Sequence, residues 1–207
     1  MDPLITPQLV GEVVDLWVRV TNAGGAVGFV RPTDSATVRP VAERTLARVA
    51  DGIDTFVGIA DPTGRIVAWA VLQRGTSGLR QHWRTVVRVM VDPDAQGSGL
   101  GRALMDAVHV VARERLGLDA LLLQVRGGTG IEEFYLRLGY ELVGRIPGAI
   151  RLGGGDDRDE FVMWRRLEDM RSDRVGAVGR RVAPSESRST ESLGPDALGY
   201  GRAVAGP

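Results

Sequence analysis

The segment from Val86 to Leu104, VVRVMVDPDAQGSGLGRAL, constrains the fold of this chain more than any other stretch. It opens with a short apolar run rich in β-branched residues, which predicts a buried strand. Asp92-Pro93-Asp94 ends that run, a glycine-rich stretch follows, and apolar residues at helical spacing begin directly after it. A strand, a glycine-rich turn and a helix N-terminus in this order predict an anion site. Free backbone N–H groups and the positive end of the helix dipole would both face the anion.

The details of the glycine stretch narrow the kind of phosphate that such a site would bind. A P-loop requires a lysine after its last glycine, whereas Arg102 follows Gly101 and the chain contains no lysine. A dinucleotide fingerprint requires a small third residue, and Arg102 would occupy that position. The pattern that fits is Q-x-x-G-x-G, formed by Gln96, Gly99 and Gly101. A glycine-rich turn that merely caps a helix has the same local signature, so the rest of the chain has to decide between the two interpretations.

Composition excludes several classes of function. The formal net charge is zero and the pI is about 6.8, which argues against a nucleic-acid or membrane-surface partner. There is no cysteine, so neither disulfides nor thiolate chemistry is expected, and with only two histidines a metal site is not expected. The chain shows no 18-residue apolar run and no basic, signal-like N-terminus. These features together predict a cytoplasmic protein.

The length of 207 residues suits one domain followed by a tail. From about Met170 the sequence becomes rich in Ser, Gly, Pro and Arg and poor in large apolar residues. Such a segment cannot bury enough apolar surface to offset the entropy lost on ordering. We therefore expect a folded domain over residues 1–169 and a disordered tail over residues 170–207.

Periodicity and turn residues predict mixed helices and strands. The expected order is a helix from Pro7 to about Val20, a helix Val38–Ala50, a hairpin of strands Thr55–Ala60 and Arg65–Gln73, the strand of the opening segment, a helix Gly99–Leu116, a strand Ala120–Val125, a short helix Ile131–Leu138, and strands Tyr140–Ile146 and Glu160–Leu167. The segment between the first two helices, GGAVGFVRPTDSATV, is either a loop packed on the core or a substrate lid with a hinge at Gly24-Gly25.

A second motif lies on the short helix. Residues 134–140, FYLRLGY, place Tyr135 at 135 − 96 = 39 residues after Gln96. By itself this motif describes a helix end with aromatic packing and a glycine cap. Together with Q-x-x-G-x-G, at this spacing and on these elements, it resembles the GNAT family of N-acetyltransferases. The resemblance covers about Leu9 to Leu167.

The resemblance implies a fold and a cosubstrate. The expected fold class is α/β, with a mixed, mostly antiparallel twisted sheet that is flanked by helices and splayed at an acyl-CoA slot. The implied cosubstrate is acetyl-CoA, and no metal is implied. The residues that the resemblance places at the cosubstrate are Val89, Met90 and Val91 on the strand, then Gln96, Gly97, Ser98, Gly99, Leu100, Gly101 and Arg102 in the loop and helix start.

The resemblance also implies the chemistry. A backbone N–H near Met90 or Val91 would polarise the thioester carbonyl, and Tyr135 would be the acid that protonates the departing thiolate. Related enzymes often carry a carboxylate base at two strand positions that are Thr85 and Gln124 here, and neither residue can act as a base. The substitutes are His82, Glu132, Glu133 and the acidic run of residues 156–160, DDRDE, and the base stays unassigned.

A narrower resemblance points to a substrate class. Residues 24–29, the strand end at Met90-Val91 and residues 144–148 resemble tabtoxin-resistance-type acetyltransferases, which implies transfer to a primary amine of a small molecule, with detoxification or antibiotic resistance as the role. Two alternatives stay open: acetylation of a protein N-terminus or lysine, and a catalytically weak acyl-CoA-binding module. The expected partner is the small-molecule amine, and a homodimer is compatible with this interpretation.

Overall fold

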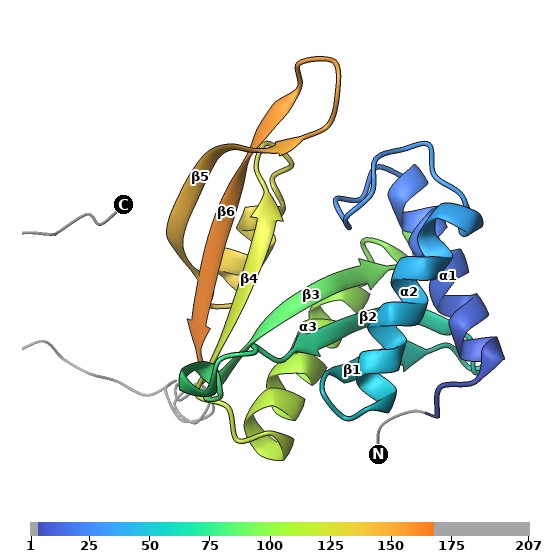
Figure 1. Cartoon of the computed structure of the whole chain (residues 1–207), viewed down its shortest axis with the longest axis horizontal. Coiled ribbons are helices and arrows are strands. Elements are labelled where there is room, and N and C mark those ends of the chain that lie inside the picture. The colour runs from blue at the N-terminus through green and yellow to red at the C-terminus, as the bar shows by residue number, and fades with distance from the viewer. Residues whose placement is uncertain (1–3, 168–207) are drawn as a thin grey trace, which may run out of the picture.

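The structure, a computed structural model, describes residues 4–167 (Figure 1). The predicted tail, residues 170–207, lies outside the described residues. The main elements are α1 Pro7–Asn22, α2 Ser35–Ala50, β1 Thr55–Ala60, β2 Ile66–Gln73, β3 Trp83–Val91, α3 Leu100–Val110, β4 Ala120–Arg126, α4 Ile131–Arg137, β5 Glu141–Arg151 and β6 Asp157–Arg166. Short 3₁₀ turns at Gly78–Arg80 and Pro93–Ala95 precede and follow β3, and a π-helical turn, Val111–Arg115, continues α3.

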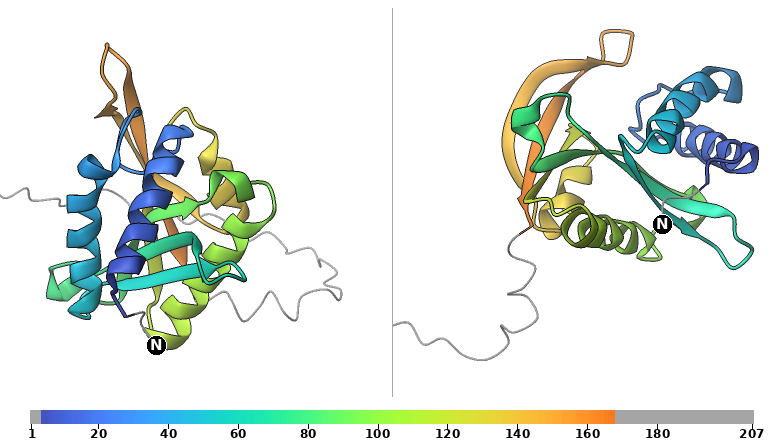
Figure 2. Two further views of the ribbon diagram at one scale, coloured as in Figure 1. Left: turned by 90° about the vertical axis from the view of Figure 1, so that its right-hand side faces the viewer. Right: turned by 60° about the horizontal axis from the view of Figure 1, so that its bottom comes forward.

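The six strands form one sheet in the order β1-β2-β3-β4-β6-β5, and helices cover both of its faces (Figure 2). β2 shows why both faces are apolar. Its residues Ala68, Ala70 and Leu72 join the core under α3 and α4, whereas Trp69 and Val71 join the core under α1 and α2. Side chains alternate across a strand, so a continuous apolar run serves two cores at once. The predicted α/β fold with a mostly antiparallel sheet is confirmed.

The sheet opens between β3 and β4. These are its parallel neighbours, and their register covers only three pairs, ending at Thr85 opposite Leu122. β3 continues to Val91 and β4 to Arg126, and the two strands diverge in Figure 1. On its other side, β3 pairs with β2 through a bulge, in which Ala70 lies opposite both Arg88 and Val89. The predicted splay is therefore present, and it begins directly after Thr85.

Several element boundaries differ from the prediction; β3, for example, begins at Trp83 rather than at Val86. α2 begins at Ser35 rather than at Val38, because the Asp34 side chain accepts a hydrogen bond from the Thr37 amide and caps the helix there. The loop expected around residues 147–159 is largely strand. Cross-strand pairs of opposite charge, Arg151 with Asp157 and Arg145 with Asp159, extend the β5–β6 hairpin into a long projecting arm. Hydrophobic periodicity could not reveal an arm whose stabilising pairs are polar.

Asp92 connects the end of β3 to the rest of the domain. Its carboxylate is buried and lies 2.5 Å from the Arg19 guanidinium of α1 and 3.5 Å from that of Arg65, which precedes β2. The hydrogen bond from Arg19 is the main reason that the pKa of Asp92 is lowered. This contact holds the start of the glycine loop against α1. No helix within residues 4–167 is long and apolar enough to cross a membrane.

A buried polar pair lies between α3 and the start of β5. The Nε2 atom of His109 is 3.2 Å from the hydroxyl of Tyr140, and both side chains are almost fully buried. Burial, together with the nearby charge of Arg165, lowers the pKa of His109 to about 3. The ring of Tyr140 in turn packs edge-on against Tyr135, with centroids 5.8 Å apart. The neutral imidazole is thus part of the packing that supports Tyr135.

The buried imidazole predicts how stability depends on pH. An unfolded His109 binds a proton below pH 6.5, whereas the folded state resists protonation down to about pH 3. The stabilisation is therefore complete above pH 6.5 and is lost as the pH falls through this interval, by at most ~1.4 kcal/mol per pH unit. His109→Gln cannot titrate, so its free energy of unfolding should fall less steeply between pH 6.5 and 4.5.

Urea unfolding at both pH values measures this slope. His82→Gln is the matched control, because His82 is exposed and precedes β3. The control should keep the slope of the unchanged protein. Equal slopes for all three proteins would show that His109 does not resist protonation.

Candidate active site

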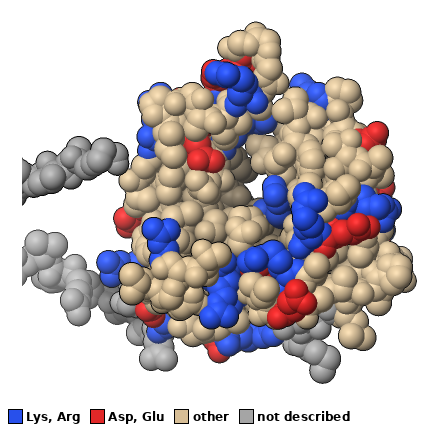
Figure 3. Space-filling model, viewed as in Figure 1, with Lys and Arg blue, Asp and Glu red and all other residues tan. Residues whose placement is uncertain are grey.

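The opening between β3 and β4 leads into a cavity of about 1020 Å³. Figure 3 shows the hollow from outside, between the two diverging parts of the sheet. The cavity is lined by the bulged part of β3, the glycine loop with the start of α3, the end of β4 with α4, Glu160 of β6, and residues 150–152 near the tip of the β5–β6 arm. The loop after α1, residues 23–30, closes the remaining side. One cavity thus brings together the two sequence motifs.

The glycine loop offers free backbone donors to the cavity. α3 begins at Leu100 without a side-chain cap, and Gly99 precedes it with φ of +88°. Within the described residues, the amides of residues 99–102 have no hydrogen-bond acceptor. No atom lies within 4 Å of where a Cβ of Gly97 or Gly99 would be, so the loop has open space beside it. Unpaired amides at a helix N-terminus suit a pyrophosphate, and the cosubstrate predicted for this loop fits the residues present.

The structure separates the predicted cosubstrate residues into two groups. Those that line the cavity are Val89, Val91, Gln96, Gly97, Gly99, Gly101 and Arg102. The other three do not line it. The Met90 side chain is buried in the core under α1 and α2, Leu100 packs on the opposite core, and the Ser98 hydroxyl donates to the Ala95 carbonyl at 2.6 Å. The predicted oxyanion donor at Met90 or Val91 is a backbone group and stays a prediction.

Tyr135 lies at the inner wall of the same cavity, on α4. Its side chain is buried, with 6% of the residue exposed, and it packs edge-on against Phe134 and Tyr140. Among the described residues, nothing accepts or donates a hydrogen bond at its hydroxyl. Burial raises the pKa of Tyr135 well above the ordinary value of 10. The phenol is therefore protonated at any pH at which the protein would work, as a proton donor has to be.

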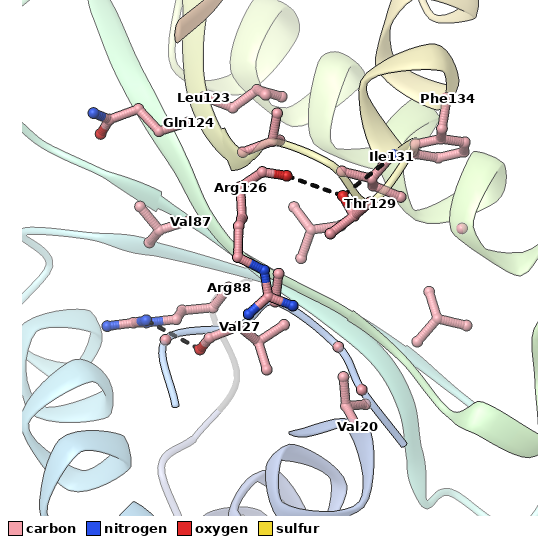
Figure 4. Close-up of a pocket in the computed structure, with 18 of the residues that line it drawn as sticks. Val20, Val27, Val87, Arg88, Leu123, Gln124, Arg126, Thr129, Ile131 and Phe134 are labelled. Atoms are coloured by element: carbon pink, nitrogen blue, oxygen red, sulfur yellow. Dashed lines mark hydrogen bonds between the residues drawn. The ribbon is translucent and has the colours of Figure 1, made fainter. Parts of the chain in front are cut away.

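Sequence reasoning missed the role of Arg88. It lies in the bulge of β3 with φ of +59°, a conformation that is rare for a residue with a Cβ. Its guanidinium stacks over Trp17 at 4.8 Å and donates to the Val27 carbonyl at 3.2 Å, away from the cavity centre (Figure 4). Trp17 donates to the same carbonyl at 3.0 Å. The loop after α1 is thus packed on the core and also walls the cavity, and a lid with a hinge at Gly24-Gly25 stays a prediction.

Sequence reasoning also missed Arg126, at the end of β4. Its side chain extends toward the middle of the cavity in Figure 4, and it forms no ion pair with another described residue. No sequence signal pointed to Arg126, because this residue ends a strand whose apolar residues predict burial. Of the proposed substitutes for the base, only Glu160 lines the cavity. Thr85 and Gln124, the two strand positions without a carboxylate, line it as well. His82, Glu132 and Glu133 do not.

Comparison with known proteins places this geometry in a family. Residues 51–142, which include the bulged strand, the glycine loop and Tyr135, match the model of the acetyltransferase (GNAT) domain. Over these residues the chain carries a GNAT acetyltransferase domain. The match begins before β1 and ends at the start of β5, so it contains both strands that form the opening.

Two curated relatives are similar in sequence to part of this chain. A tRNA uridine(34) acetyltransferase from Dehalococcoides mccartyi is 46% identical over 52 residues, which are 25% of this chain and 11% of that protein. A mycothiol acetyltransferase from Geodermatophilus obscurus is 39% identical over 95 residues, covering 39% of this chain and 29% of that protein. The chain therefore spans less than a third of either relative.

Solved structures share the fold over most of the described chain. A phosphinothricin acetyltransferase from Sinorhizobium meliloti in complex with acetyl-CoA has a TM-score of 0.65 at 18% identity, covering 80% of this chain and 86% of that one. The ribosomal-protein-S18-alanine N-acetyltransferase from Escherichia coli has a TM-score of 0.57 at 21% identity, covering 79% and 90%. At such identities the likeness shows the fold alone. Within residues 4–167, no cluster of His, Asp or Glu could hold a metal ion.

The open loop predicts a specific loss of acetyl-CoA binding in Gly99→Asp. The new side chain would enter the open space beside the loop, and its charge would repel a pyrophosphate. We expect affinity to fall more than ~10-fold, equivalent to over ~1.4 kcal/mol. Gly99→Asn is the matched control, because Asn is nearly isosteric with Asp, tolerates a positive φ and carries no charge. Calorimetric titration should rank the unchanged protein above Gly99→Asn and Gly99→Asn above Gly99→Asp. Unchanged affinity in both variants would place the cosubstrate elsewhere.

Proposed function

We propose that this GNAT domain transfers the acetyl group of acetyl-CoA to a primary amine of a small molecule. The observation that carries the proposal is the continuous opening from the free amides of the glycine loop, along the bulged β3, to Tyr135. Bound acetyl-CoA would supply an acetyl group activated as a thioester. The amides of residues 99–102 would hold its pyrophosphate, and Arg102 lies at the same end of the cavity to add a positive charge.

The shape of the cavity favours a small acceptor. Residues 23–30 border it on the side of α1, and Ile150, Arg151 and Leu152 border it from the β5–β6 arm. Arg88 and Trp17 fasten the first border to the sheet through the Val27 carbonyl. These two borders would limit the space beside the cosubstrate. An amine on a compact molecule would therefore fit better than one on a folded protein. A role in detoxification belongs to the same proposal through the resemblance to tabtoxin-resistance-type enzymes.

Thiol release from acetyl-CoA tests the proposed function. The chain has no cysteine, so a thiol reagent in the assay reports only free CoA. The panel should contain the common amino acids, spermidine, a peptide with an N-terminal alanine and a peptide with an internal lysine. We expect release with at least one small amine to exceed that with either peptide by more than tenfold. Preference for a peptide would indicate a protein acetyltransferase, and binding without release on any acceptor would indicate a binding module.

Tyr135→Phe tests the proposed acid. The change removes the hydroxyl and keeps the ring, and the hydroxyl makes no hydrogen bond within the described structure, so packing should survive. General acid catalysis is worth ~10²–10⁴-fold, and kcat should fall within that range. The KM for acetyl-CoA should change little, because the proton is needed only as the thiolate leaves.

Tyr135→Ala separates this role from simple packing. If Tyr135 only packs against the cosubstrate, the Phe variant should keep a normal kcat and the Ala variant should show a raised KM. Steady-state kinetics of both variants, on the best acceptor of the panel, distinguish the two roles. A fully active Tyr135→Phe enzyme would remove Tyr135 from the mechanism.

A further inference from the structure

The two strands that border the opening carry no acid at the expected positions. Thr85 is the last paired residue of β3 before the splay, and Gln124 lies on β4 two residues beyond its partner Leu122. Both line the cavity, and neither can accept a proton from an ammonium group. An amine must lose a proton before it can attack a thioester, so a proton acceptor has to come from another element.

The neighbouring strand β6 supplies a carboxylate at this place. Glu160 lies directly opposite Arg126 in the antiparallel register of β4 and β6, so both side chains share one face of the sheet. The Nε2 atom of Gln124 donates to Oε2 of Glu160 at 2.8 Å, diagonally across the same strand pair. Glu160 is half-buried and lines the cavity. Within the described residues, its other oxygen, Oε1, accepts no hydrogen bond.

The other acids of this region have different partners. Asp156 pairs with Arg158, Asp157 with Arg151, and Asp159 with Arg145, and none of these three carboxylates lines the cavity. These ion pairs stabilise the β5–β6 arm. In the acidic run, Glu160 is therefore the residue whose carboxylate faces the cavity with an oxygen still free to receive a proton.

We propose that Glu160 is the general base for the acceptor amine and that Gln124 is its positioning residue. This inference rests on the proposed acetyl transfer. Glu160 takes one proton from the acceptor ammonium and passes it to water. The amine nitrogen then bonds to the acetyl carbon, the carbon–sulfur bond breaks, and Tyr135 protonates the sulfur. The second nitrogen proton returns to the Tyr135 oxygen. One acetyl-CoA and one ammonium thus give one amide, one free thiol and one proton.

The charges around Glu160 suit this role. Arg126 faces it from β4, and Arg151 lines the same cavity from β5. On its other side β6 pairs with β5, where the residue opposite Glu160 is the uncharged Ile146. The hydrogen bond from Gln124 occupies Oε2 and leaves Oε1 of this cavity-lining residue without a partner among the described residues. The neighbouring strand β6 thus supplies the carboxylate that β4 lacks.

Glu160→Gln tests the base. On the best amine of the panel, kcat/KM at neutral pH should fall ~10²–10⁴-fold. The deficit should shrink at alkaline pH, where the amine itself is neutral. Acetyl-CoA affinity and the melting temperature should stay unchanged, and the same amine titrated into the CoA-saturated protein should bind more weakly. Glu141→Gln, an exposed site at the start of β5 outside the cavity, is the matched control and should keep full activity.

Gln124→Leu tests the positioning role. It keeps the carboxylate but removes the donor that orients it, so kcat should fall about tenfold with little change in the amine KM. A structural role alone would lower the melting temperature and leave the pH profile unaltered. The exchanged double variant, Gln124→Glu with Glu160→Gln, keeps the hydrogen-bonded pair and moves the carboxylate to β4. It should recover at least tenfold over Glu160→Gln.

The outcomes separate this inference from the proposed function. If the unchanged protein acetylates no amine, the proposed function fails and the role of Glu160 fails with it. If the unchanged protein is active and Glu160→Gln stays within threefold of it at every pH, Glu160 alone is excluded. Should Glu160→Gln fail to fold, the double variant decides instead. Loss of more than ~10³-fold in a double variant with normal melting temperature and acetyl-CoA affinity would overturn the proposal, because tenfold recovery from the largest expected deficit leaves no more than that.

Discussion

The broken pairing between β3 and β4 is the constraint on which the rest of this structure depends. Parallel strands normally continue their hydrogen bonds along their shared length, and here the register stops at Thr85 and Leu122. The bulge at Arg88 gives one physical cause, since an extra residue bends a strand and increases its twist. The bend turns β3 toward α1 and leaves β4 to follow β6. A cavity lined by unpaired backbone results, in the middle of an otherwise continuous sheet.

The surrounding contacts keep that opening from collapsing. Arg88 has an unfavourable backbone conformation, and burial of its guanidinium lowers its pKa. Its contacts with the Trp17 ring and the Val27 carbonyl offset these costs. At the far end of β3, Asp92 bonds to Arg19 of α1. Removing Arg19 would leave the buried Asp92 carboxylate without its main partner, which is destabilising. The bulge of β3 and the residue after its end are therefore both attached to α1, and the glycine loop begins from a fixed point.

Charge in the cavity is divided between its two ends. The glycine loop provides uncharged donors and Arg102, which suit a phosphate group. The other end holds Arg126, which has no carboxylate partner among the described residues, and the Gln124–Glu160 pair. Tyr135 lines the same cavity, and its burial keeps the phenol protonated. A donor, an acceptor and an anion site thus come from α4, β6 and the loop before α3, which are far apart in the sequence.

The sequence by itself determined the resemblance to the GNAT family, the apolar run of β3 and the glycine loop, because each depends on residues within a few positions of one another. A positive φ at Gly99 and the helix that follows are local properties, and so is the motif that carries Tyr135. The β5–β6 arm escaped prediction because its strands are stabilised by cross-strand ion pairs rather than by an apolar period. Glu160 read as one acid among several in a polar run, 36 residues from Gln124. Only the tertiary structure decided which of those acids faces the cavity, because the register between two strands is set by the packing of the whole sheet.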